Sequence, residues 1–464
     1  MAAKTAKPAK KTKTAKAKPA AKPKKTVKAK PAAKAKPVKI TAKEFEKALA
    51  IGRPPNIKKL FPNSKALIVS GKVIDRALLA KGQAMTIAAN GRNYLVIRGA
   101  LKAAQRANAA LIIEIAKSEG GASSYCATNY WNMARRVDQA MNELGITVPV
   151  AVHADHYGIK GPKDVETARV EIPSMFEAGI TSIAIDASHL PDAENLLASI
   201  ELNRYVPKWA GLETEVGEIK GKEGLSTVPE ALFLIQGLNA HGIFPDWIAL
   251  NNGTAHGIQT SEQGIQVELT AEIHEALKPY VVSGAQHGTS GNDSDRLRRI
   301  AKETLTTKAN VATALQMITW GVKVNDYGNA ELDKKGDFLK LPDSGVSQEL
   351  WAEMVAYADQ QGWKGGNYKK LNLPFENKIM SQPKKIRDRS EKAVADFIYG
   401  LLTKVFNAKD TAPLGVKAIL KAGSYNLGPK AKRIEKKAQW TEKTIRAKGA
   451  VLTPDKGPKG DFDD

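Results

Sequence analysis

The chain has 464 residues, of which 42% are hydrophobic, and it carries a formal net charge of +23. This apolar content is enough for a large core, and no uninterrupted apolar run reaches the ~20 residues that a membrane-spanning helix needs, so we expect a soluble globular protein. The only cysteine, Cys126, excludes an intramolecular disulfide and a cysteine-based zinc cluster, and it favours a cytoplasmic location.

The first 39 residues form a lysine-rich tail. They contain 15 lysines, five prolines and no Asp or Glu, so the tail holds 15 of the 23 net positive charges. Such a segment has almost nothing to bury and repels itself, which predicts disorder. It resembles the tails of linker histones, and counterion release would let it bind DNA, RNA or another polyanion without sequence preference. A solubilising or localising arm is the alternative, whereas mitochondrial transit peptides are typically rich in Arg and Ser.

Helices are predicted between the tail and the main sheet. The segment TAKEFEKALAIG places Thr41 as an N-cap, has Glu44 three residues later and ends at a glycine. This pattern is typical of a capping box at a helix start. We therefore expect residues 40–83 to be helices that lead into the main domain.

Short apolar runs alternate with longer helical patterns between residues 84 and 316. This alternation is typical of βαβ units on a parallel sheet. Eight runs predict a closed (β/α)8 TIM barrel, which with its leading helices would occupy residues 40–325. A doubly wound open sheet is the alternative, but its GxGxxG motif is absent after the first run. The runs cover residues 84–90, 110–116, 148–154, 182–188, 211–217, 246–253, 280–286 and 308–313.

Residues 326–464 are predicted to form a helical C-terminal extension. The helical pattern there is broken by Gly and Pro, as in WKGGNYKKLNLPFENKIM. We expect the extension to pack on the barrel or on a neighbouring subunit. The final fifty residues are again rich in lysine and proline, which predicts a basic and only partly ordered end.

Polar residues cluster at the carboxyl ends of the predicted strands, where barrels of this kind build their active sites. Three histidines there, His156, His256 and His287, could supply the protein ligands of a catalytic zinc ion. A lone histidine in such a loop is more often structural, and the spacing carries no motif information, so it is the joint position that favours a metal. The strand ends hold His153, Asp155, His156, Asp186, Ser188, Glu213, Glu215, His256, His287 and Asn310, while His189, His241 and His274 lie elsewhere and are interpreted as structural.

Several segments in this region resemble the class II fructose-bisphosphate aldolases. PVAVHADHYGIK is similar to the family signature around its HxDH motif, and SMFEAGITSIAIDASH is similar to the following strand. LETEVGEIKGKEG resembles the LEIELG stretch with its acidic loop, and TAHG, QHGTSG and NVAT resemble the later histidine-glycine sites and the last strand. The resemblance implies a lyase that reversibly cleaves fructose 1,6-bisphosphate into dihydroxyacetone phosphate and glyceraldehyde 3-phosphate in glycolysis and gluconeogenesis.

The resemblance also implies a role for each matching residue. It makes His156, His256 and His287 the zinc ligands. Asp155 matches the acid/base at the C4 hydroxyl, and Glu223 matches the loop acid that exchanges the proton at the enediolate carbon. The remaining matches are Glu215, Asp186 and His153 as supporting or alternative metal positions, Asn310 as a contact of the dihydroxyacetone-phosphate portion, and Ser118, Gly257, Gly288, Ser290 and Thr313 as binders of phosphate or of a monovalent cation such as Na+ or K+.

The chemistry of aldol cleavage agrees with these roles. Breaking the C3–C4 bond leaves a carbanion beside a carbonyl, and without a Schiff-base lysine its charge needs a Lewis acid such as zinc. Asp155 stands next to a predicted ligand and could take the hydroxyl proton, although a carboxylate that only orients a histidine is the alternative. Glu223 lies in a Gly- and Lys-rich loop, where the alternative is a solvated surface charge unless loop closure brings it in.

The sequence also departs from the family pattern. Ala312 stands where many members carry an Asp, Lys222 replaces an acidic neighbour, and QHGT replaces a more glycine-rich version. Sedoheptulose or tagatose bisphosphate therefore remains an alternative substrate. Arg387 and Arg389 are candidates for the family's intersubunit phosphate-binding arginine, and an even-numbered homo-oligomer is expected from the resemblance. Two rival functions remain open: a barrel scaffold whose tail binds nucleic acid, and a metal-dependent aldolase or isomerase for a non-phosphorylated ketose.

Overall fold

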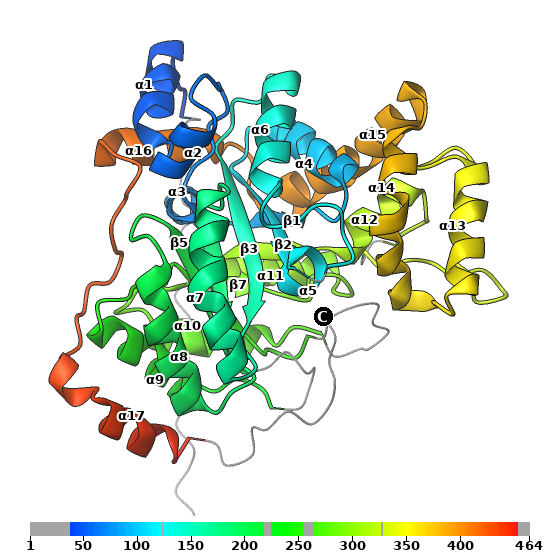
Figure 1. Cartoon of the computed structure of the whole chain (residues 1–464). Helices are drawn as coiled ribbons and strands as arrows, with labels where there is room; N and C mark the ends of the chain where they lie inside the picture. The colour runs from blue at the N-terminus through cyan, green and yellow to red at the C-terminus, as the bar shows by residue number, and fades with distance from the viewer. Residues whose placement is uncertain (1–37, 123, 218–223, 255–263, 326–327, 453–464) are drawn as a thin grey trace, which may run out of the picture. The chain divides into compact units, whose positions relative to one another are not determined.

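Eight parallel strands form a closed barrel at the centre of the protein (Figure 1). The computed structural model describes residues 38–122, 124–217, 224–254, 264–325 and 328–452. Each strand pairs with the next along the chain, and the last pairs with the first. The prediction of a TIM barrel is therefore confirmed, and the open sheet is excluded. The strands are β1 (Thr86–Asn90), β2 (Leu111–Ala116), β3 (Val150–Gly158), β4 (Ser182–Asp186), β5 (Gly211–Val216), β6 (Trp247–Leu250), β7 (Ser283–Gln286) and β8 (Thr306–Val311).

Helices surround the strands, so the strands are buried on both faces. Parallel strands in such a fold pack against helices outside and fill the barrel with side chains inside. The helices of the barrel and its leading segment are α1 (Ala42–Gly52), α2 (Pro55–Leu60), α3 (Gly71–Lys81), α4 (Tyr94–Ala107), α5 (Lys117–Gly120), α6 (Met133–Leu144), α7 (Pro162–Glu177), α8 (Asp192–Leu202), α9 (Val228–Ala240), α10 (Val267–Ala276), α11 (Ser294–Glu303) and α12 (Thr313–Trp320), with a short 3-10 helix at Asn203–Tyr205.

The predicted helix start at Thr41 is confirmed. The Thr41 hydroxyl accepts a hydrogen bond from the backbone N–H of Glu44 at 3.2 Å, and the Glu44 carboxylate accepts one from the backbone N–H of Thr41 at 2.9 Å. These reciprocal bonds satisfy two backbone donors that the first helical turn would otherwise leave unpaired. Helix α1 therefore begins where the sequence places it.

Helix α3 lies across the amino end of the barrel, where it contacts β2, β3, β5 and β8. Its buried Asp75 accepts a hydrogen bond from the hydroxyl of Thr307 at 2.8 Å and pairs with Arg76 and Lys430. The amino end is thus closed by packed and paired side chains.

The C-terminal extension packs on the barrel. Helix α15 lies against α4, α16 against α1 and α3, and α17 against α8. The described residues from Val38 onward form one compact unit. The extension is helical as expected, but antiparallel bridges join Val322 to Lys340 and Leu332 to Phe338 before its first helix. The proposed division between barrel and extension near residue 325 stays a prediction. The helices of the extension are α13 (Gln348–Gln360), α14 (Asn372–Met380), α15 (Lys384–Gly400), α16 (Ala412–Ala422) and α17 (Glu442–Gly449), with 3-10 turns at Gly365–Leu371 and Lys437–Gln439 and a π turn at Leu401–Val405.

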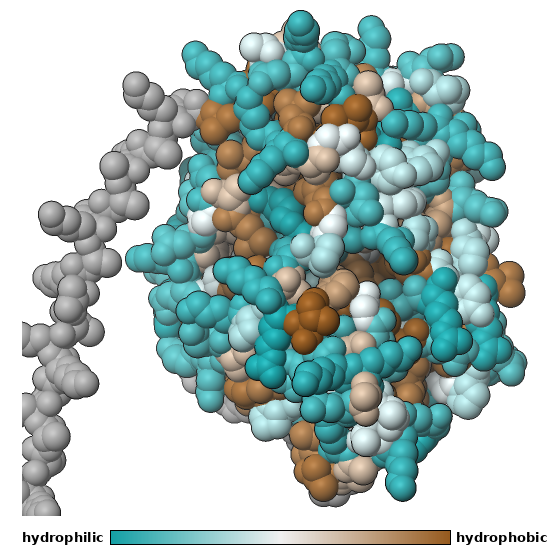
Figure 2. All heavy atoms as spheres, turned by 90° about the vertical axis from the view of Figure 1, so that its left-hand side faces the viewer, coloured by the Kyte–Doolittle hydropathy of each residue, from teal (hydrophilic) through white to brown (hydrophobic). Residues whose placement is uncertain are grey.

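The surface over α17 and its neighbours is mainly hydrophilic, with hydrophobic residues scattered among the polar ones (Figure 2). Within the described part of the chain, every helix is too short or too polar to cross a bilayer. The lysine-rich tail predicted for residues 1–39 lies, except for its last two residues, outside the described residues. Its disorder and its polyanion binding remain predictions.

Candidate active site

A cavity of about 380 Å³ opens at the carboxyl ends of the strands. Side chains and loops from β1, β2, β3, β7 and β8 line it, together with residues 364–370 of the extension. Glu223, His256 and Gly257 lie outside the described residues. The cavity brings together eight of the predicted site residues: Ser118, Asp155, His156, His287, Gly288, Ser290, Asn310 and Thr313.

A bulge in β3 aims His156 into this cavity. The register between β3 and β4 shifts between Ala154 and Tyr157, and His156 has a φ of +38°, in the left-handed region that side chains rarely adopt. In a regular strand the adjacent Asp155 and His156 would face opposite sides, because side chains alternate. A bulge re-aims a side chain, and such strained conformations persist where the surroundings hold them. Both side chains consequently line the same cavity.

Three buried side chains at the mouth are close enough to share one metal ion. Asp155, His156 and His287 each offer a ligand atom, and the three atoms lie within 4.8 Å of one another. The rings of the two histidines are 4.1 Å apart between centroids. Two imidazoles and a carboxylate are donors that zinc accepts, so the donor set fits a zinc ion.

Two more carboxylates lie behind His156. Asp186 and Glu215 each place an oxygen 3.3 Å from the Nδ1 of His156, and the three side chains form a second group that could hold a metal. Burial and the neighbouring Asp186 raise the pKa of Glu215 to about 8. Burial alone would lower the pKa of His156, but Asp155 and Glu215 outweigh it and hold that pKa well above its ordinary value. Carboxylates that draw a proton to an imidazole would also draw a divalent cation.

His287 is held in the neutral form that metals bind. Burial and the neighbouring His156 lower the pKa of His287 to about 4. Its Nε2 lies 2.8 Å from an oxygen of Glu213, and its Nδ1 lies 3.3 Å from the side-chain nitrogen of Asn310. Residues from β5 and β8 therefore fix the orientation of this ring.

A buried lysine that the sequence reasoning missed pairs with three carboxylates, two of which line the cavity. The ammonium of Lys308 lies 2.8 Å from Glu213, 3.1 Å from Glu114 and 3.1 Å from Asp155. Burial would lower the pKa of Lys308, but these three carboxylates, Asp155 first, raise it above its ordinary value. A signal existed: Lys308 is two residues before Asn310 on one strand, so both face the barrel interior.

The Lys308 ammonium also sets the charge of Asp155. Burial by itself would raise the pKa of Asp155, but Lys308, followed by His156 and His287, holds it below its usual range. Asn310 donates a hydrogen bond to the same carboxylate at 3.0 Å, while its own side-chain oxygen is buried without a hydrogen-bond partner among the described residues. The site thus presents an ionised carboxylate beside an amide oxygen that can accept a hydroxyl hydrogen.

The rim of the cavity suits phosphate. Thr313 begins helix α12 at the cavity wall, and a helix start attracts anions through its backbone N–H groups. Lysines of the extension, which the sequence reasoning did not assign, also line the cavity: Lys364, Lys369 and Lys370. Arg387 and Arg389 do not line this cavity, and the Arg389 guanidinium donates to the carbonyl oxygens of residues 345 and 346.

Comparison with known proteins agrees with this geometry. The family model described as fructose-bisphosphate aldolase class-II matches residues 72–398, which is more than half of the chain. The chain belongs to the class II fructose-bisphosphate aldolase family. The predicted resemblance is therefore confirmed, and the matched residues include every strand of the barrel.

Two curated family members and one solved structure illustrate the relationship. The chain is 29% identical over 248 residues to a fructose-bisphosphate aldolase of Mycoplasma pneumoniae, which covers 53% of this chain and 79% of the relative. It is also 29% identical over 261 residues to a fructose-bisphosphate aldolase of Streptococcus pneumoniae, and this match covers 53% of this chain and 81% of the relative. The crystal structure of a fructose-bisphosphate aldolase from Campylobacter jejuni matches this chain with a TM-score of 0.50 at 17% identity. The match covers 75% of this chain and 97% of the Campylobacter chain, so the two share the fold.

Proposed function

We propose that this family member is a zinc-dependent aldehyde-lyase that reversibly cleaves fructose 1,6-bisphosphate. The observation that carries the proposal is the meeting of Asp155, His156 and His287 in one buried group at the mouth of the barrel. Because class II aldolases use a metal, His156 and His287 of this group, together with the predicted His256, would hold the zinc, with Asp155 beside it. Bound there, zinc would supply the Lewis acid that stabilises charge beside the substrate carbonyl.

The chain's own residues support the acid–base step. Asp155, held ionised by Lys308, takes the proton of the C4 hydroxyl as the C3–C4 bond breaks. The electron pair of that bond passes to C3, and C4 becomes the aldehyde carbon. The amide oxygen of Asn310 accepts a hydrogen bond from a substrate hydroxyl.

The protonation of Lys308 argues against covalent catalysis. A Schiff base needs a neutral amine, and the three carboxylates around Lys308 hold its pKa above the ordinary value. The lysine therefore supports Asp155 electrostatically and is a poor nucleophile. This favours the metal-dependent route that the family uses.

The cations of the rim favour a bisphosphate over a neutral ketose. Lys364, Lys369 and Lys370 line the cavity together with the start of α12, so the cavity offers two kinds of group that attract phosphate. Ser118, Gly288 and Ser290 would complete the phosphate contacts, and they could also hold a monovalent cation. Sedoheptulose or tagatose bisphosphate is the alternative substrate, because Ala312 lines the cavity where many members have a carboxylate.

One experiment tests the proposal. The purified chain is assayed for bound metal and for cleavage of the three ketose bisphosphates, before and after chelation, with Zn2+ added back and with borohydride present. We expect cleavage that is lost on chelation, restored by zinc and insensitive to borohydride. His156→Ala should abolish metal binding and cleavage, whereas His274→Asn, which removes a buried imidazole outside the cavity, should keep both. Cleavage that survives His156→Ala would contradict the proposal.

The remaining proposals concern the location, the oligomeric state and the N-terminal tail of the protein. We propose a cytoplasmic homo-oligomer whose residues 1–39 bind polyanions without sequence preference. Salt-dependent DNA binding, measured with and without residues 1–39, tests the tail. Affinity that survives the deletion would instead favour a nucleic-acid site on the barrel.

A further inference from the structure

A second cavity, of about 500 Å³, lies at the other end of the barrel. Ala210 and Leu212 at the start of β5 line it, as does Phe244, which precedes β6. Lys72 at the start of α3 and Lys437 of the extension also line it. Because these strand positions are amino ends and the active site lies at carboxyl ends, the two cavities are separate. Its volume falls within the range of about 300 to 1,000 Å³ that small-molecule sites have.

The walls of this cavity carry positive charge and no carboxylate. Its cations are Lys72, Arg204, Lys208 and Lys437, and none of the lining residues is Asp or Glu. Within the described residues, the side chains of Arg204, Lys208 and Lys437 form no ion pair. Cations gathered without counter-charges favour an anionic ligand. Arginine and lysine are the side chains that proteins use most for phosphate.

Lys72 is the deepest of these cations, with 8% of its surface exposed. Its ammonium donates a hydrogen bond to the backbone carbonyl of Lys208 at 2.6 Å and forms no ion pair with a described carboxylate. The nearby Asp246 is already engaged, because it pairs with Arg76 at 3.2 Å and accepts the backbone N–H of Leu212 at 3.1 Å. Asp246 attracts the Lys72 ammonium but does not offset its burial, which lowers the pKa of Lys72, and an anion in the cavity would offset more of that cost.

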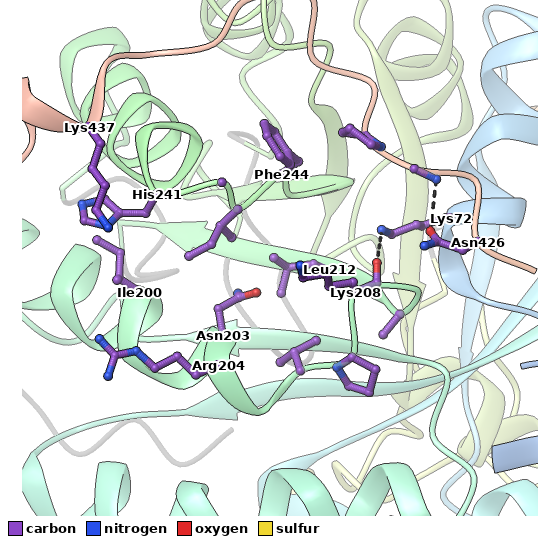
Figure 3. A pocket seen from close by; sticks show the side chains of 17 residues that line it. Lys72, Ile200, Asn203, Arg204, Lys208, Leu212, His241, Phe244, Asn426 and Lys437 are labelled. Atoms are coloured by element: carbon purple, nitrogen blue, oxygen red, sulfur yellow. Dashed lines mark hydrogen bonds between the residues drawn. The ribbon is translucent and has the colours of Figure 1, made fainter. Parts of the chain in front are cut away.

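Between the cations the cavity wall is partly apolar, with Asn203 as a polar member. Figure 3 shows Lys437 and Arg204 on one side and Lys72 on the other, with Leu212 and Phe244 between them. An aromatic ring and aliphatic side chains offer a surface on which a flat ligand ring can stack. The ligand that matches this wall therefore has an anionic group and a planar, weakly polar part.

The C-terminal extension builds one wall of the cavity and is held firmly. Lys430 pairs with Asp75 at 2.5 Å and donates to the hydroxyl of Ser283 at 2.9 Å. The ring of His241 lies 2.9 Å from the carbonyl oxygen of Trp440. The wall residues from 426 to 437 lie beyond residue 398, where the family match ends. The cavity is therefore preformed by a segment outside the matched part of the chain.

We infer that this cavity is a second ligand site, which binds a nucleoside phosphate. Arg204 and Lys437 hold the phosphate groups on one side of the cavity, and the base lies on Phe244 and Leu212, toward Lys72. The inference does not depend on the proposed aldolase reaction, because none of the residues that line this cavity also lines the active-site cavity.

Calorimetric titration of the full chain with ADP, inorganic phosphate and adenosine tests the inference. The cavity variant is Arg204→Glu/Lys437→Glu, which changes two exposed cations that line the cavity. The matched control is Lys384→Glu/Lys392→Glu, which makes the same change of charge on exposed residues of α15. Melting temperatures of both variants show whether each is folded.

We expect ADP to bind about tenfold more tightly than phosphate or adenosine alone. The cavity variant should weaken ADP binding at least about tenfold, and the control should change it less than about twofold. Phe244→Ala should remove most of the preference for ADP over phosphate. Equal weakening in both charge variants, ADP affinity no better than that of phosphate, or no binding to the unmodified chain would each overturn the inference.

Discussion

The ammonium of Lys308, which solvent does not reach, lies 3.1 Å from the carboxylate of Asp155 beneath the active-site cavity. Glu114 and Glu213 complete the surroundings of the lysine at 3.1 and 2.8 Å. Burial and the charge of Asp155 raise the pKa of Glu114 well above its ordinary value, whereas Lys308 and two histidines outweigh burial and lower that of Glu213. The Lys308 ammonium thus favours the ionised forms of Asp155 and Glu213, whereas burial and Asp155 outweigh it at Glu114.

Replacing this lysine should shift the pH dependence of the enzyme. In Lys308→Met, burial would no longer be offset, so the pKa of Asp155 would rise. We expect the acidic limb of the pH profile of kcat/KM to move upward by more than about one pH unit. Because three carboxylates lose their cation, the free energy of unfolding should fall by about 3 kcal/mol or more.

A second substitution separates the two effects of Lys308→Met. Adding Glu114→Gln removes one carboxylate and should restore part of the lost stability without restoring the pH profile. An unshifted acidic limb in a folded Lys308→Met variant would show that Lys308 does not set the charge of Asp155.

Asp155→Asn should separate proton transfer from metal binding. The amide keeps the size of the side chain but cannot take the C4 hydroxyl proton, so kcat should fall by about 10² to 10⁴. His156 and His287 remain, and we expect metal analysis to find the zinc content retained. A variant that loses metal together with activity would make Asp155 a ligand, and one that keeps kcat within about tenfold would make it an orienting residue.

The rim lysines should affect substrate binding more than turnover. In Lys364→Gln/Lys370→Gln we expect the KM for the bisphosphate to rise about tenfold while kcat stays within about twofold, because phosphate contacts are present in both the bound and the transition state. Steady-state kinetics of Lys378→Gln/Lys384→Gln, with the same change of charge outside the cavity, should match the parent. A similar rise in KM in both double variants would show that the effect comes from the lower net charge of the protein and not from lost contacts with phosphate.

The sequence was sufficient for the barrel because its signals are local. Seven strands fall within or within two residues of a predicted apolar run, β3 continues four residues past its run to Gly158, and helix α1 begins at its capping box. Asp155, His156 and His287 were found because they lie inside recognisable motifs. Local signals of this kind need no knowledge of the three-dimensional path.

The missed residues depend on how distant segments meet. A single lysine in a strand is usually on a surface, and only closure of the barrel places Lys308 among Glu114, Asp155 and Glu213. Lys364 and Lys370 reach the cavity from the extension, whose return over the barrel no local pattern encodes. The φ of His156 depends on a bulge that is set by the pairing with β4.

Acid stability should depend on His274, which is buried in α10 and accepts the backbone N–H of Leu305 at 2.9 Å. Burial, followed by the charge of Lys430, lowers its pKa to about 4, against 6.5 in an unfolded chain. Above pH 6.5 both states are neutral. Between pH 6.5 and 4 the unfolded chain binds a proton that the folded chain does not, so the free energy of unfolding should fall by about 3 kcal/mol as pH drops through this window.

His274→Asn keeps an acceptor for the Leu305 N–H and removes the titration. Guanidinium unfolding of both proteins at pH 7.5 and 4.5 isolates the effect, because the other titrating groups are common to the two. We expect the parent to lose about 2 to 3 kcal/mol more than the variant between these pH values. Equal losses would show that the folded chain accommodates a charged His274. The His274 ring would then pack less tightly against β7 than the structure indicates, where a Cβ added to Gly284 would lie only 2.5 Å from the ring.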